Sequence, residues 1–181
     1  FDPLESVAVL ASDSYSAMKA REKLNISWDR GVHAVHNSSD YLNDLAEKVS
    51  SGPGRVARER GDTDVALGEA KKVVEAIYLA PYLAHAPMEP PVATAHIHNG
   101  ICEIWACTQT PQKTQQAVAS ALGMDDKSVK VHVTLLGGGF GRKSKPDFSV
   151  EAALLARDSG RPVQVIWTRE ETTQHGFYRP A

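Results

Sequence analysis

The sequence predicts an α+β fold in which helices pack against mixed β-sheets. Runs rich in β-branched residues, which are typical of buried strands, alternate along the chain with segments whose apolar residues recur every three or four positions, as in amphipathic helices. The clearest unit combines a strand at 129–136, a loop with four glycines at 137–141 and a helix that begins near Asp147. A strand from Val163 to Trp167 follows this helix, so the order is that of a βαβ-like unit.

The composition of the 181 residues narrows the class of protein. Apolar residues make up 42%, charged residues 23%, and the formal net charge is −2. Because nucleic-acid-binding domains usually carry a clear basic excess, nucleic acid is not an expected partner. No run of about 18 apolar residues is present, so no membrane-spanning helix is expected. The chain begins at Phe1 instead of Met, and we therefore expect it to be a part excised from a longer protein.

The N-terminal region predicts a strand, a helix and a second strand. Residues 6–11 form an apolar run, Ser12 or Asp13 can cap the helix, and 25–29 are again strand-like.

A domain boundary is predicted after the next helix, which begins at Ser38 and stops at 50–54. The following residues, 55–61, are polar, rich in arginine and without periodicity, so they predict a linker. The linker's three arginines could bind phosphate, but a solvated loop is the favoured interpretation.

Between the linker and the first clear hairpin, the pattern predicts a short helix, a long strand and an irregular loop. Asp62 caps the helix, 73–83 is the strand, and the prolines of 85–91 exclude regular structure. His85 and Glu89 in this loop could form an acid–base pair. The favoured alternative is that Glu89 accepts backbone N–H groups of its own turn while His85 packs nearby.

A β-hairpin is predicted from two alternating runs, 92–98 and 101–107. Asn99-Gly100 joins them and is the strongest short signal of a hairpin turn. His96 and His98 share one face of the first strand, so they could chelate a metal. No third ligand lies near them in the sequence, and two half-exposed strand histidines are the favoured interpretation.

The two cysteines are expected to be buried free thiols. Cys102 and Cys107 lie five positions apart on the predicted strand, so their side chains point to opposite faces. This spacing excludes both a mutual disulfide and a shared metal ion.

Two later helices have clear ends. Thr110-Pro111 supplies an N-cap followed by proline at the first helical position, and Gly123 closes that helix. The second helix starts at Pro146-Asp147 and closes at Gly160.

The glycine loop at 137–141 is the strongest candidate for a binding site. Glycine permits positive φ and close approach of a ligand, so consecutive backbone N–H groups can point inward as an anion nest. Arg142, Lys143 and Lys145 follow at once and could serve an anionic ligand or face water. The loop matches neither G-x-G-x-x-G nor a G-K-[ST] ending, so a tight turn without a ligand is an equal alternative. Phe140 either anchors the loop to the core or forms a wall of a cavity.

Short motifs occur along the chain in this order: Met88-Glu89-Pro90, Thr108-Gln109, Gly137-Gly138-Gly139-Phe140-Gly141-Arg142, Gly160-Arg161-Pro162-Val163, Thr168-Arg169-Glu170-Glu171 and Phe177-Tyr178-Arg179-Pro180. Together they resemble the large subunit of molybdenum hydroxylases, the family of xanthine dehydrogenase and aldehyde oxidoreductase. Within that family, the chain is most similar to the beta subunit of isoquinoline 1-oxidoreductase and to membrane-associated aldehyde dehydrogenases. The resemblance covers nearly the whole chain.

The resemblance implies two domains. Residues 1–54 correspond to a partial small, hammerhead-like α/β domain, 55–61 to a linker, and 62–181 to the N-terminal portion of a molybdopterin-binding domain. Because the small domain lacks its opening strands, we expect an exposed sheet edge and self-association of the chain.

The resemblance also implies that the parent is an enzyme, a molybdopterin-dependent oxidoreductase that hydroxylates an N-heterocycle or an aldehyde with water as the oxygen donor. Its cofactor is molybdopterin cytosine dinucleotide, and its electrons pass to a separate iron–sulfur small subunit. The residues expected to contact the cofactor, through backbone N–H groups, are Gly138, Gly139, Phe140, Gly141 and Arg142.

The family's catalytic base is a glutamate in a late Gly-x-Gly-Glu segment, which this chain lacks. No catalytic and no metal-binding residue is therefore expected here, and the chain by itself should be inactive and free of cofactor. Xanthine dehydrogenases carry a substrate-contacting glutamate where this chain has Ser144, which argues against a purine substrate. The substrate, the electron acceptor and the location of the parent (bacterial cytoplasm, periplasm or a membrane-associated complex) stay open.

Two functions of other classes stay open as well. A stand-alone domain could bind an anionic nucleotide through the glycine nest without redox chemistry, or the chain could be a structural assembly domain.

Overall fold

The fold is described from a computed structural model, which describes residues 6–178. The chain divides into two units. The first holds the described residues up to Ser27 together with Ala84–Tyr178, and the second holds Trp28–Leu83. The domain boundaries that the sequence indicated, at 54 and 61, stay a prediction.

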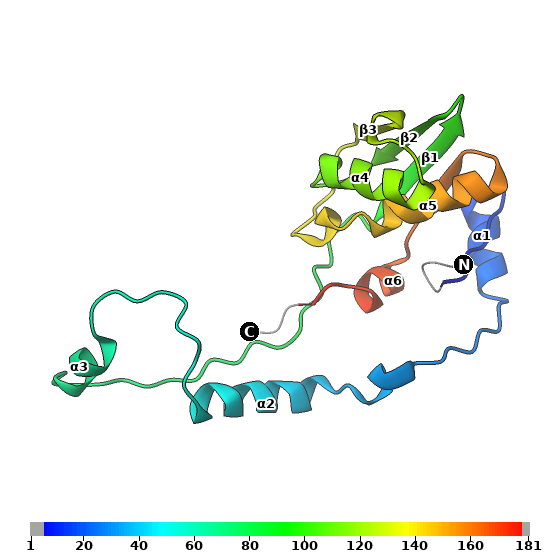
Figure 1. Cartoon of the computed structure of the whole chain (residues 1–181). Helices are drawn as coiled ribbons and strands as arrows, with labels where there is room; N and C mark the ends of the chain where they lie inside the picture. Colours follow the sequence, from blue (N-terminus) through cyan, green and yellow to red (C-terminus); the bar gives the residue numbers. More distant parts are fainter. Residues whose placement is uncertain (1–5, 179–181) are drawn as a thin grey trace. The chain divides into compact units, whose positions relative to one another are not determined.

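The first unit is built around one open, four-stranded sheet (Figure 1). Its strand order is β3-β2-β1-β4. β1 runs antiparallel to both β2 and β4, whereas β2 and β3 are parallel. The predicted α+β class, with helices packed against a mixed sheet, is therefore confirmed. The strands are β1 Val92–His98, β2 Ile101–Ala106, β3 Val129–Val133 and β4 Val163–Ile166.

The predicted hairpin is present as β1 and β2. Asn99 and Gly100 both have positive φ, 49° and 74°, as a two-residue type I′ turn requires. The turn sets the register in which His98 lies opposite Ile101.

Two long helices connect the parallel strands. α4, Pro111–Leu122, links β2 to β3, and α5, Asp147–Ser159, links β3 to β4. Gly123 and Gly160 end them with φ of 67° and 64°, so both predicted helix ends are confirmed. The βαβ-like order around α5 is confirmed too, but β3 and β4 lie at opposite edges of the sheet because β2 and β1 separate them.

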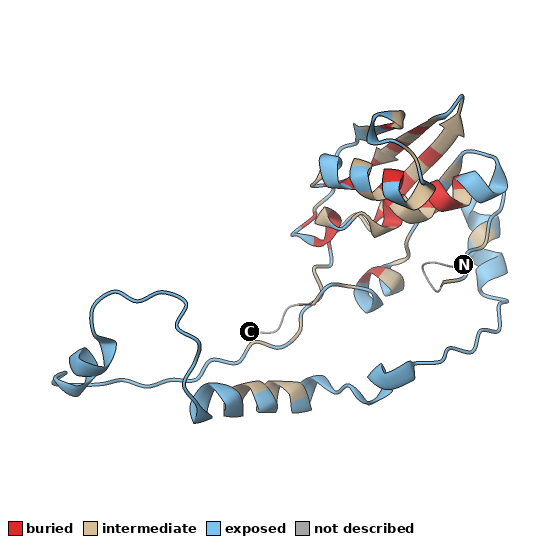
Figure 2. Cartoon of the chain, in the orientation of Figure 1, coloured by how far each residue is buried: buried red, intermediate tan, exposed pale blue. Residues whose placement is uncertain are grey.

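The core lies between the sheet and these two helices (Figure 2). α5 packs against β1 and β4, and α4 packs against β3 and α5. Many core side chains are alanines, which lets the helices approach the sheet closely. The core includes Ala93, Ala95, Cys102, Ile104, Ala106, Val118, Phe148, Ala152 and Ala153.

The remaining helices are short or belong to the second unit. α1 is capped by Asp13 and α2 by Asn37, and each capping side chain accepts backbone N–H groups of the first turn. No helix among residues 6–178 is both long and apolar enough to cross a bilayer. The bounds are α1 Ser14–Arg21, α2 Ser38–Ser51, α3 Thr63–Gly68 and α6 Arg169–Gln174, with short 3-10 turns at Gly31–Val35, Asp126–Ser128 and Arg142–Ser144.

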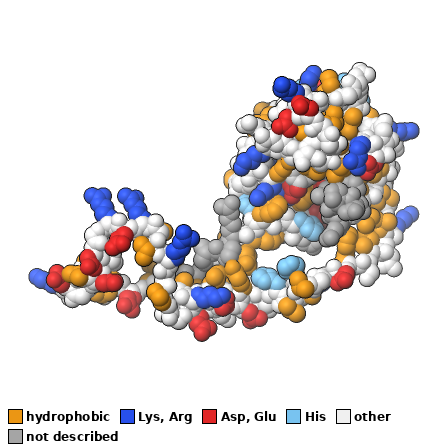
Figure 3. All heavy atoms as spheres, viewed as in Figure 1, with side chains coloured by type: hydrophobic (Ala, Val, Ile, Leu, Met, Phe, Trp, Pro, Cys, Tyr) orange, Lys and Arg blue, Asp and Glu red, His pale blue; other side chains and the backbone are white. Residues whose placement is uncertain are grey.

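Three predicted strands are wrong. Residues 6–11, 25–29 and 73–83 have no strand structure, and most of their large apolar side chains are exposed, Tyr78 by 89%. Apolar side chains also appear on the surface in Figure 3. A strand forms only where its backbone can pair with another strand, and these runs find no partner among the described residues.

Candidate functional site

The glycine loop lies at one edge of the sheet, where several segments meet. β1 is antiparallel to its neighbours, so its N-terminal end lies beside the C-terminal ends of β2 and β4. The C-terminal end of β3 lies at this edge too, because β3 is parallel to β2. The segments at 85–91, 107–110, 134–144 and 167–169 therefore converge, although the sequence separates them widely.

The loop backbone is strongly bent. Gly138 and Gly141 have φ of 94° and 95°, and Phe140 has φ of 50°. A bulky residue in the left-handed region is uncommon, so the loop holds Phe140 in an unfavourable backbone conformation. Its side chain is 72% exposed, which excludes the predicted role of core anchor.

Side chains of other segments approach the other two glycines closely. A Cβ atom on Gly137 would lie 2.6 Å from Cβ of Glu89, and one on Gly139 would lie 2.5 Å from Oε1 of Gln109. Both distances are shorter than real Cβ atoms show, so a neighbour must shift if either glycine gains a side chain. At Gly137 the neighbour is the Cβ of Glu89, which is held close to the backbone, whereas at Gly139 it is the flexible end of the Gln109 side chain, which can move.

The backbone donors of the loop divide into two groups. Gly137 N–H donates to Glu89 Oε2 at 3.0 Å, Gly141 N–H donates to Gln109 Oε1 at 3.0 Å, and Arg142 N–H donates to Gly139 O at 2.9 Å. The N–H groups of the three residues between them, 138–140, have no acceptor among the described residues. The loop thus presents three consecutive donors on a backbone that the flanking bonds fix.

Glu89 and Lys143 form an ion pair next to the loop, and Glu89 also accepts the N–H of Gly137. The Lys143 side chain is fully buried, and its Nζ lies 2.5 Å from Glu89 Oε2. Burial alone raises the pKa of Glu89, but the hydrogen bonds from Lys143 and from Gly137 N–H outweigh it and hold this pKa below its ordinary value. Glu89 is therefore a structural carboxylate. It accepts the N–H of Gly137 and not, as expected, an N–H of its own turn.

His85 lies beside the same loop. Its Nε2 is the atom nearest to the position of a Cβ on Gly141, at 3.8 Å. No hydrogen bond joins it to Glu89 among those that the structure shows, so the acid–base pair considered from the sequence is not formed.

Gln109 is a site residue that the sequence reasoning missed. In the sequence, Thr108-Gln109 stood out only as one of the motifs that carry the family resemblance. Besides accepting from Gly141, Gln109 donates its own N–H to Lys143 O at 2.9 Å, and Thr110 Oγ1 donates to Ser144 O at 3.0 Å. The turn after β2 therefore holds the residues that follow the glycine loop. A signal was present in the sequence, since a polar turn directly after a buried strand is a common place for binding residues.

Two of the three cations that follow the loop are paired with carboxylates inside the fold. Arg142 is buried and makes a two-pronged ion pair with Asp147, and Lys143 is buried against Glu89. Lys145 is exposed and lies 4.9 Å from the ring centre of Phe177. The charges of Arg142 and Lys143 are therefore paired with carboxylates inside the fold, and Lys145 is the exposed cation of the three.

The other candidates from the sequence are structural. His98 and His132 both bond to Glu103, at 2.8 and 3.1 Å, on the face of the sheet away from the helices. His96 and His98 both lie half-exposed on β1, so the interpretation of them as half-exposed strand residues is confirmed. Within residues 6–178 no group of three or more suitable side chains could hold a metal ion. Cys102 and Cys107 are buried free thiols, as predicted, and burial raises the pKa of Cys102 to about 11.

The arginine-rich stretch in the second unit is also exposed along its length. Arg55, Arg58 and Arg60 face solvent, as the favoured interpretation of a solvated loop predicts.

Comparisons with known proteins identify relatives of the whole chain. The family model described as "Molybdopterin cofactor-binding domain" matches residues 48–180. Isoquinoline 1-oxidoreductase subunit beta of Brevundimonas diminuta is 30% identical over 97% of this chain and 24% of its own length. Membrane-bound aldehyde dehydrogenase of Gluconacetobacter polyoxogenes is 31% identical over 96% of this chain and 23% of its own length.

A solved structure shares the fold. Aldehyde oxidoreductase from Desulfovibrio gigas matches with a TM-score of 0.61 and 26% identity, over 66% of this chain and 14% of its own. The chain thus spans about a quarter of the length of the curated relatives and a smaller share of the solved one.

Proposed function

The chain belongs to the molybdopterin cofactor-binding domains of the molybdenum hydroxylase family, and from this premise we propose that its glycine loop binds the molybdopterin cofactor in a longer subunit. The proposed binding residues are Gly138, Gly139 and Phe140, whose backbone N–H groups donate, and Gly141, whose lack of a side chain lets the ligand approach the backbone. The parent subunit is an oxidoreductase that acts on an N-heterocycle or an aldehyde, with water as the oxygen donor.

One observation carries the assignment of the loop. Three consecutive N–H groups, at 138–140, have no acceptor among the described residues, whereas the N–H groups of Gly137 and Gly141 on either side are bonded. The phosphate and oxo oxygens of a molybdopterin cofactor are hydrogen-bond acceptors, so they complement these donors. The residues present therefore fit the group that the family implies. When bound, the cofactor supplies the two-electron redox chemistry.

The protein's contribution at this loop is preorganisation. Glu89 and Gln109 fix its two ends by accepting the N–H groups of Gly137 and Gly141. The donors between them need no rearrangement when an anionic oxygen arrives, which makes each hydrogen bond more effective than one to a mobile loop. The exposed ring of Phe140 lies beside Gly138, since a Cβ on Gly138 would be 3.2 Å from Cε2 of this ring.

None of the described residues is proposed to act as an acid or a base in the reaction. Glu89 is held ionised by Lys143, and the base is proposed to come from a later part of the parent. The cofactor is proposed to be the cytosine dinucleotide form, and electrons are proposed to leave through an iron–sulfur subunit. The relatives named as subunits support the presence of partner chains.

The test is the cofactor content of the full-length subunit. Elemental analysis should give one molybdenum per folded subunit, and acid hydrolysis should release a pterin and cytidine monophosphate in equal amounts. Release of another nucleotide would contradict the cytosine form alone. A native protein that ends near Ala181 and binds a free nucleotide without molybdenum would contradict the enzyme and support the stand-alone nucleotide-binding domain.

A further inference from the structure

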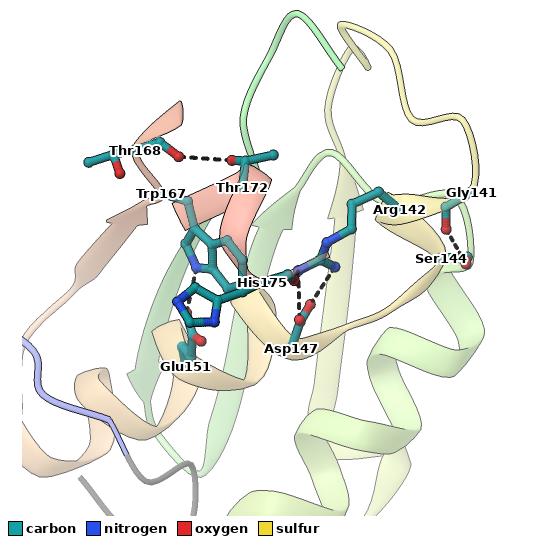
Figure 4. Close-up of polar contacts among 9 residues, drawn as sticks. All are labelled: Gly141, Arg142, Ser144, Asp147, Glu151, Trp167, Thr168, Thr172 and His175. Atoms are coloured by element: carbon teal, nitrogen blue, oxygen red, sulfur yellow. Dashed lines mark hydrogen bonds and ion pairs between the residues drawn. The ribbon is translucent and has the colours of Figure 1, made fainter. Parts of the chain in front are cut away.

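Arg142 directly follows the glycine loop, and its guanidinium is buried in the interior. Only 1% of its side chain is exposed. Nη1 and Nη2 donate to the two carboxylate oxygens of Asp147, at 3.0 and 2.8 Å (Figure 4). Such a fork-to-fork pair fixes the plane of the guanidinium as well as its position.

Aromatic rings lie on the guanidinium as well. The ring centres of Trp167 and Phe177 are 4.9 and 5.0 Å from Cζ of Arg142. Trp167 follows β4, and Phe177 follows α6, so the guanidinium contacts segments that are far from it in sequence. Stacking of a desolvated guanidinium on aromatic faces is favourable, and a lysine cannot reproduce it because it lacks the planar group.

Further bonds hold Trp167 in place. Its Nε1–H donates to Glu151 Oε2 at 2.7 Å, and its backbone N–H donates to Pro91 O at 3.0 Å. Nη2 of Arg142 also lies 3.5 Å from the backbone oxygen of His175. The indole is thus fixed to α5, and the backbone of Trp167 is fixed to the segment before β1. Figure 4 shows the indole between Arg142 and Glu151.

The backbone of Arg142 takes part in the loop itself. Its N–H donates to Gly139 O at 2.9 Å and closes the turn over Phe140. Its Nε is buried without an acceptor among the described residues, which costs free energy. The guanidinium therefore keeps its place through Asp147, Trp167 and Phe177 although one of its N–H groups is left without an acceptor.

We propose that Arg142 is a positioning residue, which sets the conformation of the glycine loop through a clamp formed by Asp147, Trp167 and Phe177 and makes no side-chain contact with the cofactor. The proposal rests on the proposed function of the loop. It assigns a role to the stretch from Trp167 to Phe177, which docks on the arginine from the far side.

The clamp is tested in the 181-residue chain, which needs no cofactor for this measurement. Hydrogen exchange of the bonded amides of Gly141 and Arg142 is followed by NMR, with the amides of β1 and β2 as internal reference. Phe177→Ala removes one stacking face and leaves the ion pair with Asp147 intact. Phe177→Tyr is the conservative variant that retains the face, and Arg142→Lys retains the charge alone. Arg157→Met, an exposed arginine on α5, is the matched control.

We expect the loop amides to exchange at least tenfold faster in Phe177→Ala and Arg142→Lys. They should keep the wild-type rate in Phe177→Tyr and Arg157→Met, with the reference amides unchanged throughout. An unchanged loop, or an equal increase in the loop and in the sheet, would overturn the proposal.

Molybdenum content of the full-length subunit separates the clamp from the proposed function. Reduced metal together with faster loop exchange supports both. Reduced metal in Arg142→Lys with unchanged loop exchange would identify a direct contact and overturn the clamp. Faster loop exchange with full metal content supports the clamp and contradicts the role of the loop in cofactor binding.

Discussion

Replacing Glu151 by glutamine should remove a pH dependence of stability that the fold creates. Glu151 lies on α5 beside Trp167, and burial raises its pKa to about 7. The hydrogen bond from the indole and the charge of Arg142 act in the opposite direction, whereas the carboxylates of Asp147 and Glu171 add to the rise. The folded chain therefore binds this proton more tightly than the unfolded chain does.

The sign and size of the effect follow from linkage. Below pH 4.5, the ordinary value for this group, both states are protonated and the folded state carries no penalty. Between pH 4.5 and about 7 the unfolded state loses the proton first, so the free energy of unfolding falls as the pH rises. At 1.36 kcal/mol per pH unit, the loss amounts to roughly 3 kcal/mol and is complete above pH 7.

Chemical denaturation of the chain between pH 4 and pH 8.5, in steps of about half a unit, measures this loss. Glu151→Gln keeps a side-chain oxygen that can accept the indole N–H but cannot ionise. The variant should match the wild type near pH 4.5 and exceed its free energy of unfolding by about 2–3 kcal/mol at pH 8. Glu170→Gln, an exposed position on α6, is the control and should leave the curve unchanged. Parallel curves for Glu151→Gln and the wild type would refute the assignment of a buried carboxyl.

Three further outcomes are expected. Gly139→Val should cost about 1–3 kcal/mol of unfolding free energy, because the new Cβ meets Gln109. In denaturation experiments, adding Gln109→Ala to this variant should recover most of the loss. A full loss in the double variant would contradict this cause. Glu89→Gln should cost about 3–5 kcal/mol, since it leaves the buried ammonium of Lys143 without its counter-charge, and a loss below 1 kcal/mol would show that the pair is solvated. The chain should self-associate in sedimentation equilibrium through exposed apolar residues, and Ile77→Asp should shift it toward monomer; a monomeric wild type at high concentration would exclude this.

Local chemistry made part of the fold predictable. The hairpin at Asn99-Gly100 and the helix ends at Gly123 and Gly160 depend on φ > 0 at residues that tolerate it, and such signals lie within a few positions of each other. The strands at 6–11 and 73–83 failed for the opposite reason. Apolar content favours a strand, but pairing depends on a partner that no local pattern specifies.

In the candidate site, too, local features could be predicted from the sequence and contacts between distant residues could not. The sequence indicated positive φ within the glycine loop, and the structure places it at Gly138, Phe140 and Gly141. It could not indicate that Gly137 and Gly139 make room for Glu89 and Gln109, because these contacts join residues 48 and 30 positions apart.

Burial of the two cations was missed because charged side chains are normally exposed. Arg142 and Lys143 are buried only because Asp147 and Glu89 pair with them, and the second of these partners lies 54 residues away. Pattern reasoning over a short window therefore placed their charges toward a ligand or toward water.

The most direct test of the cofactor-binding loop compares a glycine of the loop with a positive-φ glycine outside it. Gly141 and Gly123 both have positive φ, 95° and 67°, and a Cβ on either meets nothing closer than 3.8 Å. Gly141→Ala and Gly123→Ala should therefore each cost about 1–2 kcal/mol of stability for the left-handed backbone. Molybdenum per folded full-length subunit should fall at least tenfold in Gly141→Ala and stay at the wild-type level in Gly123→Ala. Full molybdenum content in both variants would contradict the proposal and leave 137–141 as a structural turn.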